Sequence, residues 1–182
     1  MPEAQRIKTK VCLVGEAAVG KTSLIRRFVQ DEFDDRYITT LGAKVSKREM
    51  AFETPDRTKI HMDMTVWDIM GEKGFRELLK DAYFYGANGI LAVADLTRRR
   101  TLDNLDDWID GVEDVAGKVP ILIAINKSDL AVNARFREID VAAFAKAYDA
   151  EFVLTSAKTG VRVEDAFRRL GALIAGQQLQ LA

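Results

Sequence analysis

One short segment constrains this chain more than any other: residues 15–22 read Gly-Glu-Ala-Ala-Val-Gly-Lys-Thr. They follow a β-rich run at 7–14 and lead into helical periodicity over 21–31. A glycine-rich turn between a strand and a helix exposes backbone N–H groups, and the helix start adds the positive end of its dipole. The spacing therefore predicts a phosphate-binding loop, with Lys21 as a cation for the β- and γ-phosphates and Thr22 as a Mg²⁺ ligand.

Consecutive positions of this loop are expected to contact the phosphates: Gly15, Ala18, Val19, Gly20, Lys21, Thr22 and Ser23. Glycine permits a close approach of the backbone to the ligand at the first and sixth positions of the motif. The alternative is a merely tight turn that binds nothing. Chance matches to the pattern exist, but few of them lie between a strand and a helix.

The rest of the chain alternates apolar runs with helical periodicity. Further strands are predicted at 44–53, 60–67, 89–94, 119–125 and 151–155, and further helices at 102–116, 139–148 and 163–175. The runs at 89–94 and 119–125 are continuously apolar, which is typical of parallel strands covered on both faces. We therefore predict an α/β protein with helices on both sides of a sheet, and a ligand site at the carboxyl ends of its strands.

Composition predicts one soluble globular domain over 1–182, with short flexible tails at about 1–6 and 176–182. Hydrophobic residues make up 48% of the chain, which excludes a disordered protein. The 27 basic and 28 acidic residues give a net charge of -1, so no general attraction to nucleic acid is expected. The single cysteine, Cys12, excludes an internal disulfide and a cysteine zinc cluster, and its predicted strand makes it an inert packing residue.

No apolar stretch reaches the roughly 20 residues that span a bilayer. Pro2 stands where N-myristoylation requires glycine, and residues 177–182 contain no cysteine for prenylation. We therefore expect a monomeric, cytoplasmic protein without a direct lipid anchor. Any membrane association would come through a protein partner.

Two more segments follow predicted strands at the same edge of the sheet: Asn126-Lys127-Ser128-Asp129 and Ser156-Ala157-Lys158. The Asp129 carboxylate can accept from both N1–H and the 2-amino group of guanine, a pair of donors that adenine lacks. A base that cannot make this contact is strongly rejected, because a buried polar group is then left unpaired. The Lys127 stem can lie along the base, and a backbone N–H near Ala157 can donate to O6. After the phosphate loop, this order of segments predicts a guanine-nucleotide site.

With these motifs the chain resembles the small GTPases of the Ras superfamily, nearest the Rab-like branch, from about Lys8 to Ile174. Five segments carry the resemblance in order: GEAAVGKT, Thr40 within Thr39-Thr40-Leu41-Gly42, Trp67-Asp68-Ile69-Met70-Gly71, NKSD and SAK. Phe33, which packs edge-on against guanine in the family, and Tyr37 in the first switch also match. The resemblance implies the three-layer P-loop NTPase fold, with a mostly parallel six-stranded sheet, one antiparallel edge hairpin and helices on both faces.

The resemblance also implies how the nucleotide state changes the molecule. Thr22 and Thr40 would bind Mg²⁺, with Asp68 holding the ion through water. Thr40 and the Gly71 N–H would contact the γ-phosphate and keep their loops ordered. Hydrolysis would release these loops and alter the surface that partners bind. GTP or GDP and Mg²⁺ are thus the expected cofactors.

The second switch departs from the family's Asp-Thr-Ala-Gly-Gln. Here Glu72 replaces the Gln that orients the attacking water, and a carboxylate can accept from water but cannot donate to it. Its charge would also lie near the γ-phosphate. Met70 replaces a small residue, and Ala17 places a methyl group beside the site of an arginine finger. We therefore expect slow hydrolysis, unless Glu72 simply points to solvent; the expected catalytic residues are Lys21, Thr40, Gly71 and Glu72.

Three functions remain open at this point. The first is a GTP/GDP-dependent switch with Mg²⁺-dependent, slow GTP hydrolysis. The second is a non-hydrolysing GTP-dependent binding module, because Glu72 replaces the family's Gln. The third is a P-loop phosphotransferase, against which the NKSD and SAK segments and the lack of an Arg-rich lid argue. Protein effectors and regulators are expected on the switch regions, at about 34–44 and 68–85, and no nucleic acid is expected as a partner.

Overall fold

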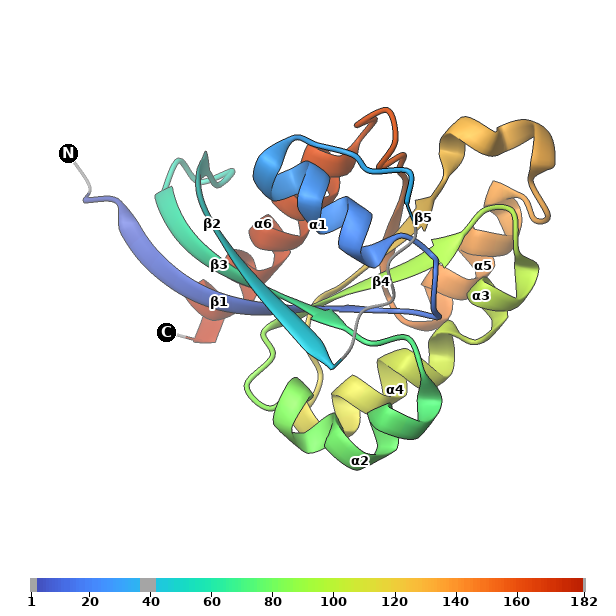
Figure 1. Ribbon diagram of the computed structural model, residues 1–182. Helices are drawn as coiled ribbons and strands as arrows, with labels where there is room; N and C mark the ends of the chain where they lie inside the picture. Colours follow the sequence, from blue (N-terminus) through green and yellow to red (C-terminus); the bar gives the residue numbers. More distant parts are fainter. Residues whose placement is uncertain (1–2, 37–41, 182) are drawn as a thin grey trace.

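Six strands form a sheet in the order β2-β3-β1-β4-β5-β6 (Figure 1). The computed structural model describes residues 3–36 and 42–181. The β2–β3 pair is antiparallel, and every other pairing in the sheet is parallel. This arrangement confirms the predicted mostly parallel sheet with one antiparallel edge hairpin. The strands are β1 (Gln5–Val14), β2 (Ala43–Glu53), β3 (Lys59–Ile69), β4 (Gly89–Asp95), β5 (Ile121–Asn126) and β6 (Glu151–Leu154).

Helices cover both faces of the sheet, which confirms the three-layer P-loop NTPase fold (Figure 1). One face carries α1 (Lys21–Gln30) and α6 (Val163–Leu181). The opposite face carries α2 (Lys73–Phe84), α3 (Arg99–Asp103), α4 (Leu105–Ala116) and α5 (Glu138–Ala147), while the 3-10 helix η1 (Ser128–Asn133) follows β5. The sequence pattern did not predict α2. This helix exposes Leu78 and Leu79, so its apolar residues do not form a single core-facing stripe.

Alternation along the strands divides the core into two clusters. In β3 the side chains of Ile60, Met62, Met64 and Val66 pack under α1 and α6, where Phe28 stacks on Phe167 with ring centroids 3.9 Å apart. Cys12 of β1 points to the other cluster and is fully buried. Burial raises the pKa of its thiol to about 12, as expected for an inert packing residue.

Two predicted elements differ in detail. The helix predicted over 102–116 is broken between α3 and α4 at Asn104, whose Nδ2 donates to Glu16 Oε1 at 2.5 Å. This side chain thus bonds to the loop after β1 at the point where the helix is interrupted. The strand predicted from 119 begins at Ile121, because Pro120 has no N–H to donate to a neighbouring strand.

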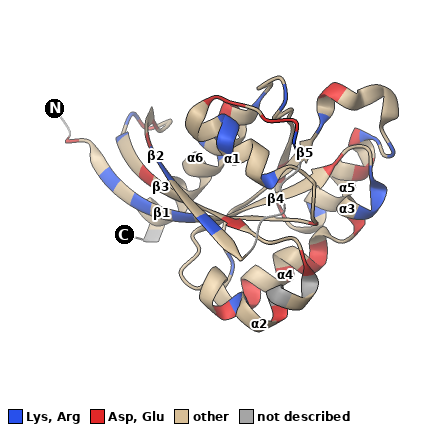
Figure 2. Cartoon of the chain, viewed as in Figure 1, with Lys and Arg blue, Asp and Glu red and all other residues tan. Residues whose placement is uncertain are grey.

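Secondary structure extends into both ranges for which short flexible tails were expected, at about 1–6 and 176–182. The pairing of β1 with β3 already begins at Gln5, and α6 continues to Leu181. The last turns of α6 are held because Ala175 is buried and Leu179 packs against the core. Basic and acidic residues are interspersed over the elements (Figure 2). Within the described residues, no helix has the length and apolarity needed to cross a membrane.

Candidate functional site

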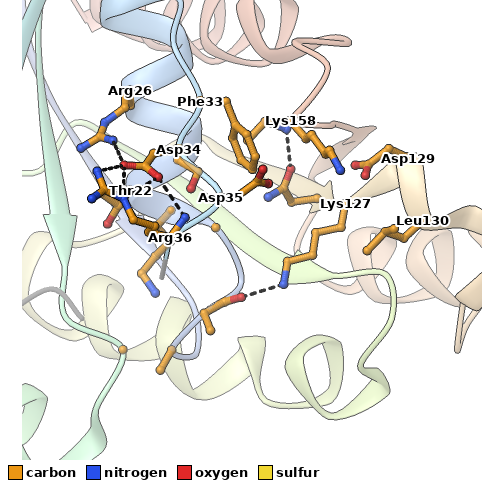
Figure 3. Close-up of a pocket in the computed structure, with 18 of the residues that line it drawn as sticks. Thr22, Arg26, Phe33, Asp34, Asp35, Arg36, Lys127, Asp129, Leu130 and Lys158 are labelled. Carbon is orange, nitrogen blue, oxygen red and sulfur yellow. Dashed lines mark hydrogen bonds and ion pairs between the residues drawn. The ribbon is translucent and has the colours of Figure 1, made fainter. Parts of the chain in front are cut away.

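The loops that leave the central strands enclose a pocket of about 390 Å³. Figure 3 shows Thr22 and Arg36 toward one end of this pocket and Asp129 toward the other. Most predicted site residues line it: Ala18, Gly20, Lys21, Thr22, Ser23, Phe33, Gly71, Glu72, Asn126, Lys127, Asp129, Ala157 and Lys158. The remaining described ones, Gly15, Val19, Asp68 and Ser156, lie outside this lining. Tyr37 and Thr40 lie outside the described residues.

The loop after β1 has space only for glycine at two positions. A Cβ on Gly15 would lie 2.3 Å from the Val93 carbonyl oxygen, and one on Gly20 would lie 2.2 Å from Asn126 Nδ2. Both residues have positive φ, as does Ala18 between them. Gly20 caps α1 without any side chain, so the N–H groups of the first turn are left for a ligand. The loop therefore has the form of an anion cradle.

Lys21 supplies a buried cation beneath this cradle. Its Nζ donates to the carbonyl oxygens of Gly15 at 2.7 Å and Glu16 at 2.9 Å. Burial lowers the pKa of Lys21 to about 8, although the charge of Asp68 opposes that shift. Carbonyl oxygens are only partial counter-charges, so an anion in the pocket would stabilise the protonated lysine.

Thr22 and Asp68 bring two hard oxygen groups together. The Thr22 Oγ1 donates to Asp68 Oδ2, across from the first turn of α1 to β3. Asp68 is almost fully buried at 1% exposure. A hydroxyl beside a carboxylate suits Mg²⁺, which prefers oxygen ligands and is held by one or two carboxylates together with phosphate. These residues therefore fit the expected ion.

Asn126, the last residue of β5, forms hydrogen bonds to segments at both ends of the pocket. Its Nδ2 donates to the Val19 carbonyl at 3.0 Å, in the phosphate loop. Its Oδ1 accepts from the Ala157 N–H at 3.1 Å and from Thr155 Oγ1 at 3.2 Å, in the segment after β6. Asn126 thus acts as a structural connector, whereas Asp129 presents the carboxylate suited to the base.

Asp129 is oriented from the neighbouring loop. Ser156 Oγ donates to its Oδ1 at 2.7 Å, which leaves Oδ2 for a ligand. Lys127 has a positive φ of 66°, and its Nζ reaches back to the Ala18 carbonyl at 3.0 Å (Figure 3). The stem of Lys127 therefore runs along the pocket wall between Asp129 and the phosphate loop.

One backbone donor of the SAK loop is already engaged within the protein. The Ala157 N–H donates to Asn126, so a contact to O6 requires sharing of this donor or use of the neighbouring Lys158 N–H. Arg27 of α1 fixes the loop from behind, since Nε donates to the Ala157 carbonyl at 2.9 Å and Nη2 to the Lys158 carbonyl at 2.7 Å. Sequence reasoning missed Arg27 because no motif includes it.

The second switch begins in direct contact with the phosphate loop. A Cβ on Gly71 would lie 2.3 Å from the Ala17 nitrogen, so only glycine allows this approach. Met70 is buried, and its N–H donates to the Gly42 carbonyl at 3.0 Å. Glu72 immediately precedes α2 and lines the pocket while remaining exposed to solvent. The role of Glu72 at the reaction site stays a prediction.

Charged residues of α1 and of the segment after it also line the pocket, and the sequence motifs do not include them. Arg36 Nη2 lies 2.8 Å from Asp34 Oδ2, and Arg26 Nη1 lies 3.6 Å from the same oxygen. Hydrogen bonds from Arg36 lower the pKa of Asp34 to about 2. Figure 3 places this cluster beside Thr22. The run of charges between Phe33 and Tyr37 was the available sequence signal.

Comparison with known proteins identifies the family. The sequence profile of the Ras family matches residues 10–175, which span the strands and loops of the pocket. The chain belongs to the Ras family. Its relatives include GTP-binding protein YPTM1 of Zea mays, 33% identical over 177 residues that cover 94% of this chain and 82% of the relative. Ras-related protein Rab-13 of Rattus norvegicus and of Canis lupus familiaris are each 32% identical over 162 residues, which cover 88% of this chain and 77% of theirs.

These similarities confirm the predicted Rab-like resemblance. As a member of the Ras family, the chain is a small GTP-binding switch protein with the general GTPase activity of that family. The individual roles of Thr22, Asp68, Glu72 and Asp129 remain predictions.

Proposed function

We propose that this Ras-family protein is a GTP/GDP-dependent switch that hydrolyses GTP slowly. One observation carries the proposal: a single pocket joins the buried Lys21 at one end to the Ser156-oriented carboxylate of Asp129 at the other. A cation suited to phosphate and an acceptor suited to guanine thus line one continuous cavity. Phe33 and the stem of Lys127 supply apolar surface for the base between them.

The phosphate end would act through its own backbone and side chains. N–H groups of the loop and of the first turn of α1 would bind the β-phosphate, and Lys21 would neutralise its charge. The Thr22 hydroxyl and, through water, Asp68 would hold Mg²⁺, which supplies charge neutralisation at the β- and γ-oxygens when bound. Thr40 would contact this ion and the γ-phosphate. The Gly71 N–H would also contact the γ-phosphate.

The slow rate is proposed from the chemistry of Glu72. A carboxylate has no N–H to donate to the transferring phosphoryl group, whereas the amide of the family's Gln has two. Glu72 would also bring a negative charge toward a negatively charged centre. If Glu72 prevents turnover altogether, the protein is instead a non-hydrolysing GTP-dependent binding module. The two functions share every nucleotide-binding residue, and only turnover separates them.

We further propose that effectors and regulators bind the switch regions, at about 34–44 and 68–85. The exposure of Leu78 and Tyr85, at 80% and 78%, supports a protein-binding surface there. The expectations of a monomer, located in the cytoplasm and reaching membranes through a protein partner, stand as proposals with it.

Mass identification of the nucleotide that copurifies with the chain tests the binding function first. Guanine nucleotide is expected, and tighter binding of ATP than GTP would reject the assignment.

Asp129→Asn should then shift the preference from guanine to xanthine nucleotides, because the amide can donate to the 2-oxo group. An unchanged preference would show that Asp129 does not read the base.

Single-turnover hydrolysis of preloaded GTP tests the rate. The expected rate constant is below about 10⁻³ s⁻¹, close to the intrinsic rate of about 3–5 × 10⁻⁴ s⁻¹ known for Ras. A clearly faster reaction would contradict the slow-switch proposal. No release of phosphate over days would favour the non-hydrolysing module.

A further inference from the structure

We propose that Asp95 is a positioning residue that holds two cations against the phosphate loop and thereby slows nucleotide release. The inference rests on the proposed nucleotide-binding function and adds a group outside its sequence motifs. Asp95 ends β4, next to β1 in the sheet, and its side chain is 1% exposed.

The Asp95 carboxylate is saturated with donors. Its Oδ2 lies 2.8 Å from Lys127 Nζ and 3.0 Å from Arg98 Nε. Its Oδ1 accepts from the Thr97 N–H at 2.8 Å and from Thr97 Oγ1 at 2.6 Å. Burial opposes ionisation, but the hydrogen bonds from Lys127 and Thr97 outweigh it, and the pKa of Asp95 lies below its ordinary value. Asp95 is therefore a fixed negative charge at neutral pH.

Both cations continue from Asp95 to the phosphate loop. Lys127 Nζ donates to the Ala18 carbonyl at 3.0 Å, and Arg98 Nη2 donates to the Ala17 carbonyl at 3.0 Å. Two consecutive peptide groups of the loop are thus held by one carboxylate through two bridging side chains.

The direction of these bonds matters for ligand binding. In a planar trans peptide the C=O and the following N–H point in opposite directions. Holding the Ala17 and Ala18 carbonyls outward therefore aims the N–H groups of Ala18 and Val19 toward the opposite side, where the cradle lies. A cradle fixed in this way needs no rearrangement when phosphate arrives, and loses that advantage if the cations are released.

Arg98 also brings a positive charge to the same end of the pocket, because its Nη2 lies 3.0 Å from the Ala17 carbonyl oxygen. A bound phosphate would be attracted by this charge.

The neighbouring arginine offers a matched control. Arg99 is also paired with acids, at 3.1 Å to Asp103 and 3.6 Å to Asp140, and neither of these pairs involves the phosphate loop. It lies one residue along the chain from Arg98, with a similarly half-exposed side chain. Replacing either arginine removes one partly exposed charge and its ion pairing, but the bond to the Ala17 carbonyl is lost only with Arg98.

The test is the dissociation rate of a fluorescent GDP from the full chain, chased with excess GDP in the presence of Mg²⁺. Arg98→Met should raise this rate about tenfold, the factor expected for losing a hydrogen bond from a charged group. Arg99→Met should change it less than about twofold, as for a surface ion pair. Equal rates for the two variants would overturn the proposal.

A double-mutant cycle tests whether Arg98 acts through Asp95. Asp95→Asn should also raise the dissociation rate, and the double variant should be little faster than the faster single variant. If the effects of the two substitutions on the dissociation rate simply multiply, Asp95 does not position Arg98, and the proposal is rejected. If Asp95→Asn does not fold, the comparison of Arg98→Met with Arg99→Met decides.

Two controls distinguish the proposed positioning role of Asp95 from a general effect on stability and from a failure of nucleotide binding. A merely structural role for Arg98 would lower the unfolding temperature of the nucleotide-free chain and leave dissociation unchanged, which would also overturn the proposal. Failure of the wild-type chain to bind any guanine nucleotide would instead reject the proposed function itself.

Discussion

Ser156 Oγ donates a 2.7 Å hydrogen bond to Asp129 Oδ1, while accepting from the Thr159 N–H at 3.1 Å. Ser156 is buried, and the single proton of its hydroxyl is directed at the carboxylate. Asp129 is therefore held in one orientation before a base arrives, with its second oxygen free to accept. The loop after β6 thereby sets the geometry of an acceptor that belongs to the loop after β5.

Ser156→Ala should weaken GDP binding about tenfold, the effect of one hydrogen bond to a charged acceptor. The loss should be smaller for IDP, whose base lacks the 2-amino group that pairs with Asp129. Competition binding with both nucleotides measures the ratio. Equal losses for GDP and IDP would mean that Ser156 supports the loop without orienting the carboxylate.

Glu72→Gln should raise the single-turnover rate of GTP hydrolysis about tenfold or more, because the amide can both accept from water and donate to the transferring phosphoryl group. Glu72→Ala is the matched control and should stay within about threefold of the wild type. GDP affinity should be unchanged in both. If Glu72→Ala instead shows no measurable GTP hydrolysis, the carboxylate contributes to catalysis.

Nucleotide affinity should fall as the pH rises above about 8. The pKa of Lys21 is lowered from 10.5 in the unfolded chain to about 8 in the fold, so its buried charge opposes folding below pH 8 and this cost is relieved between 8 and 10.5. Bound phosphate favours the protonated lysine, so binding must take up a proton once Lys21 is neutral.

Calorimetry of GDP binding in two buffers of different ionisation enthalpy measures that proton. We expect little uptake at pH 7 and up to one proton per nucleotide at pH 9. Lys21→Arg is the control, because arginine stays charged throughout this range. Titration of the nucleotide itself is common to both proteins and cancels. Equal proton uptake by the two would contradict the assignment.

Phe167→Ala should lower the free energy of unfolding by about 3–5 kcal/mol, as for other large-to-small changes in a packed core. Phe167 is fully buried and stacks on Phe28, whose ring also lies 4.3 Å from the Arg48 guanidinium carbon. Denaturant unfolding of the nucleotide-free chain measures the loss. Leu173→Ala, on the exposed side of α6, is the control, with an expected loss well under 1 kcal/mol.

Much of the fold was predictable because its elements bury one face at a regular period. Alternate residues of β3 enter the core, and Phe167 and Ile174 lie on one face of α6 that is also buried. Such one-sided burial is the pattern from which the ranges 60–67 and 163–175 could be predicted. α2 escaped prediction because its exposed Leu78 and Leu79 break that rule. The division at Asn104 depends on a partner 88 residues away, which local periodicity cannot indicate.

The residues of the site likewise fall into those that the sequence could indicate and those that it could not. Lys21 and Asp129 could be expected to line one pocket because each belongs to a short sequence motif, and both do line it. Arg98 and Arg27 donate to backbone carbonyls of distant segments, and Asp95 pairs with Arg98. Carbonyl acceptors leave no mark on the sequence of those segments. Only the folded chain shows that these charges converge on the loops of the pocket.

The amide of Asn126 has a mechanical consequence. Because it links Val19 on one side to Ala157 on the other, the loop after β1 and the loop after β6 share one fixed support. A substitution that removes this amide would therefore disturb both loops at once, although they lie far apart in the sequence.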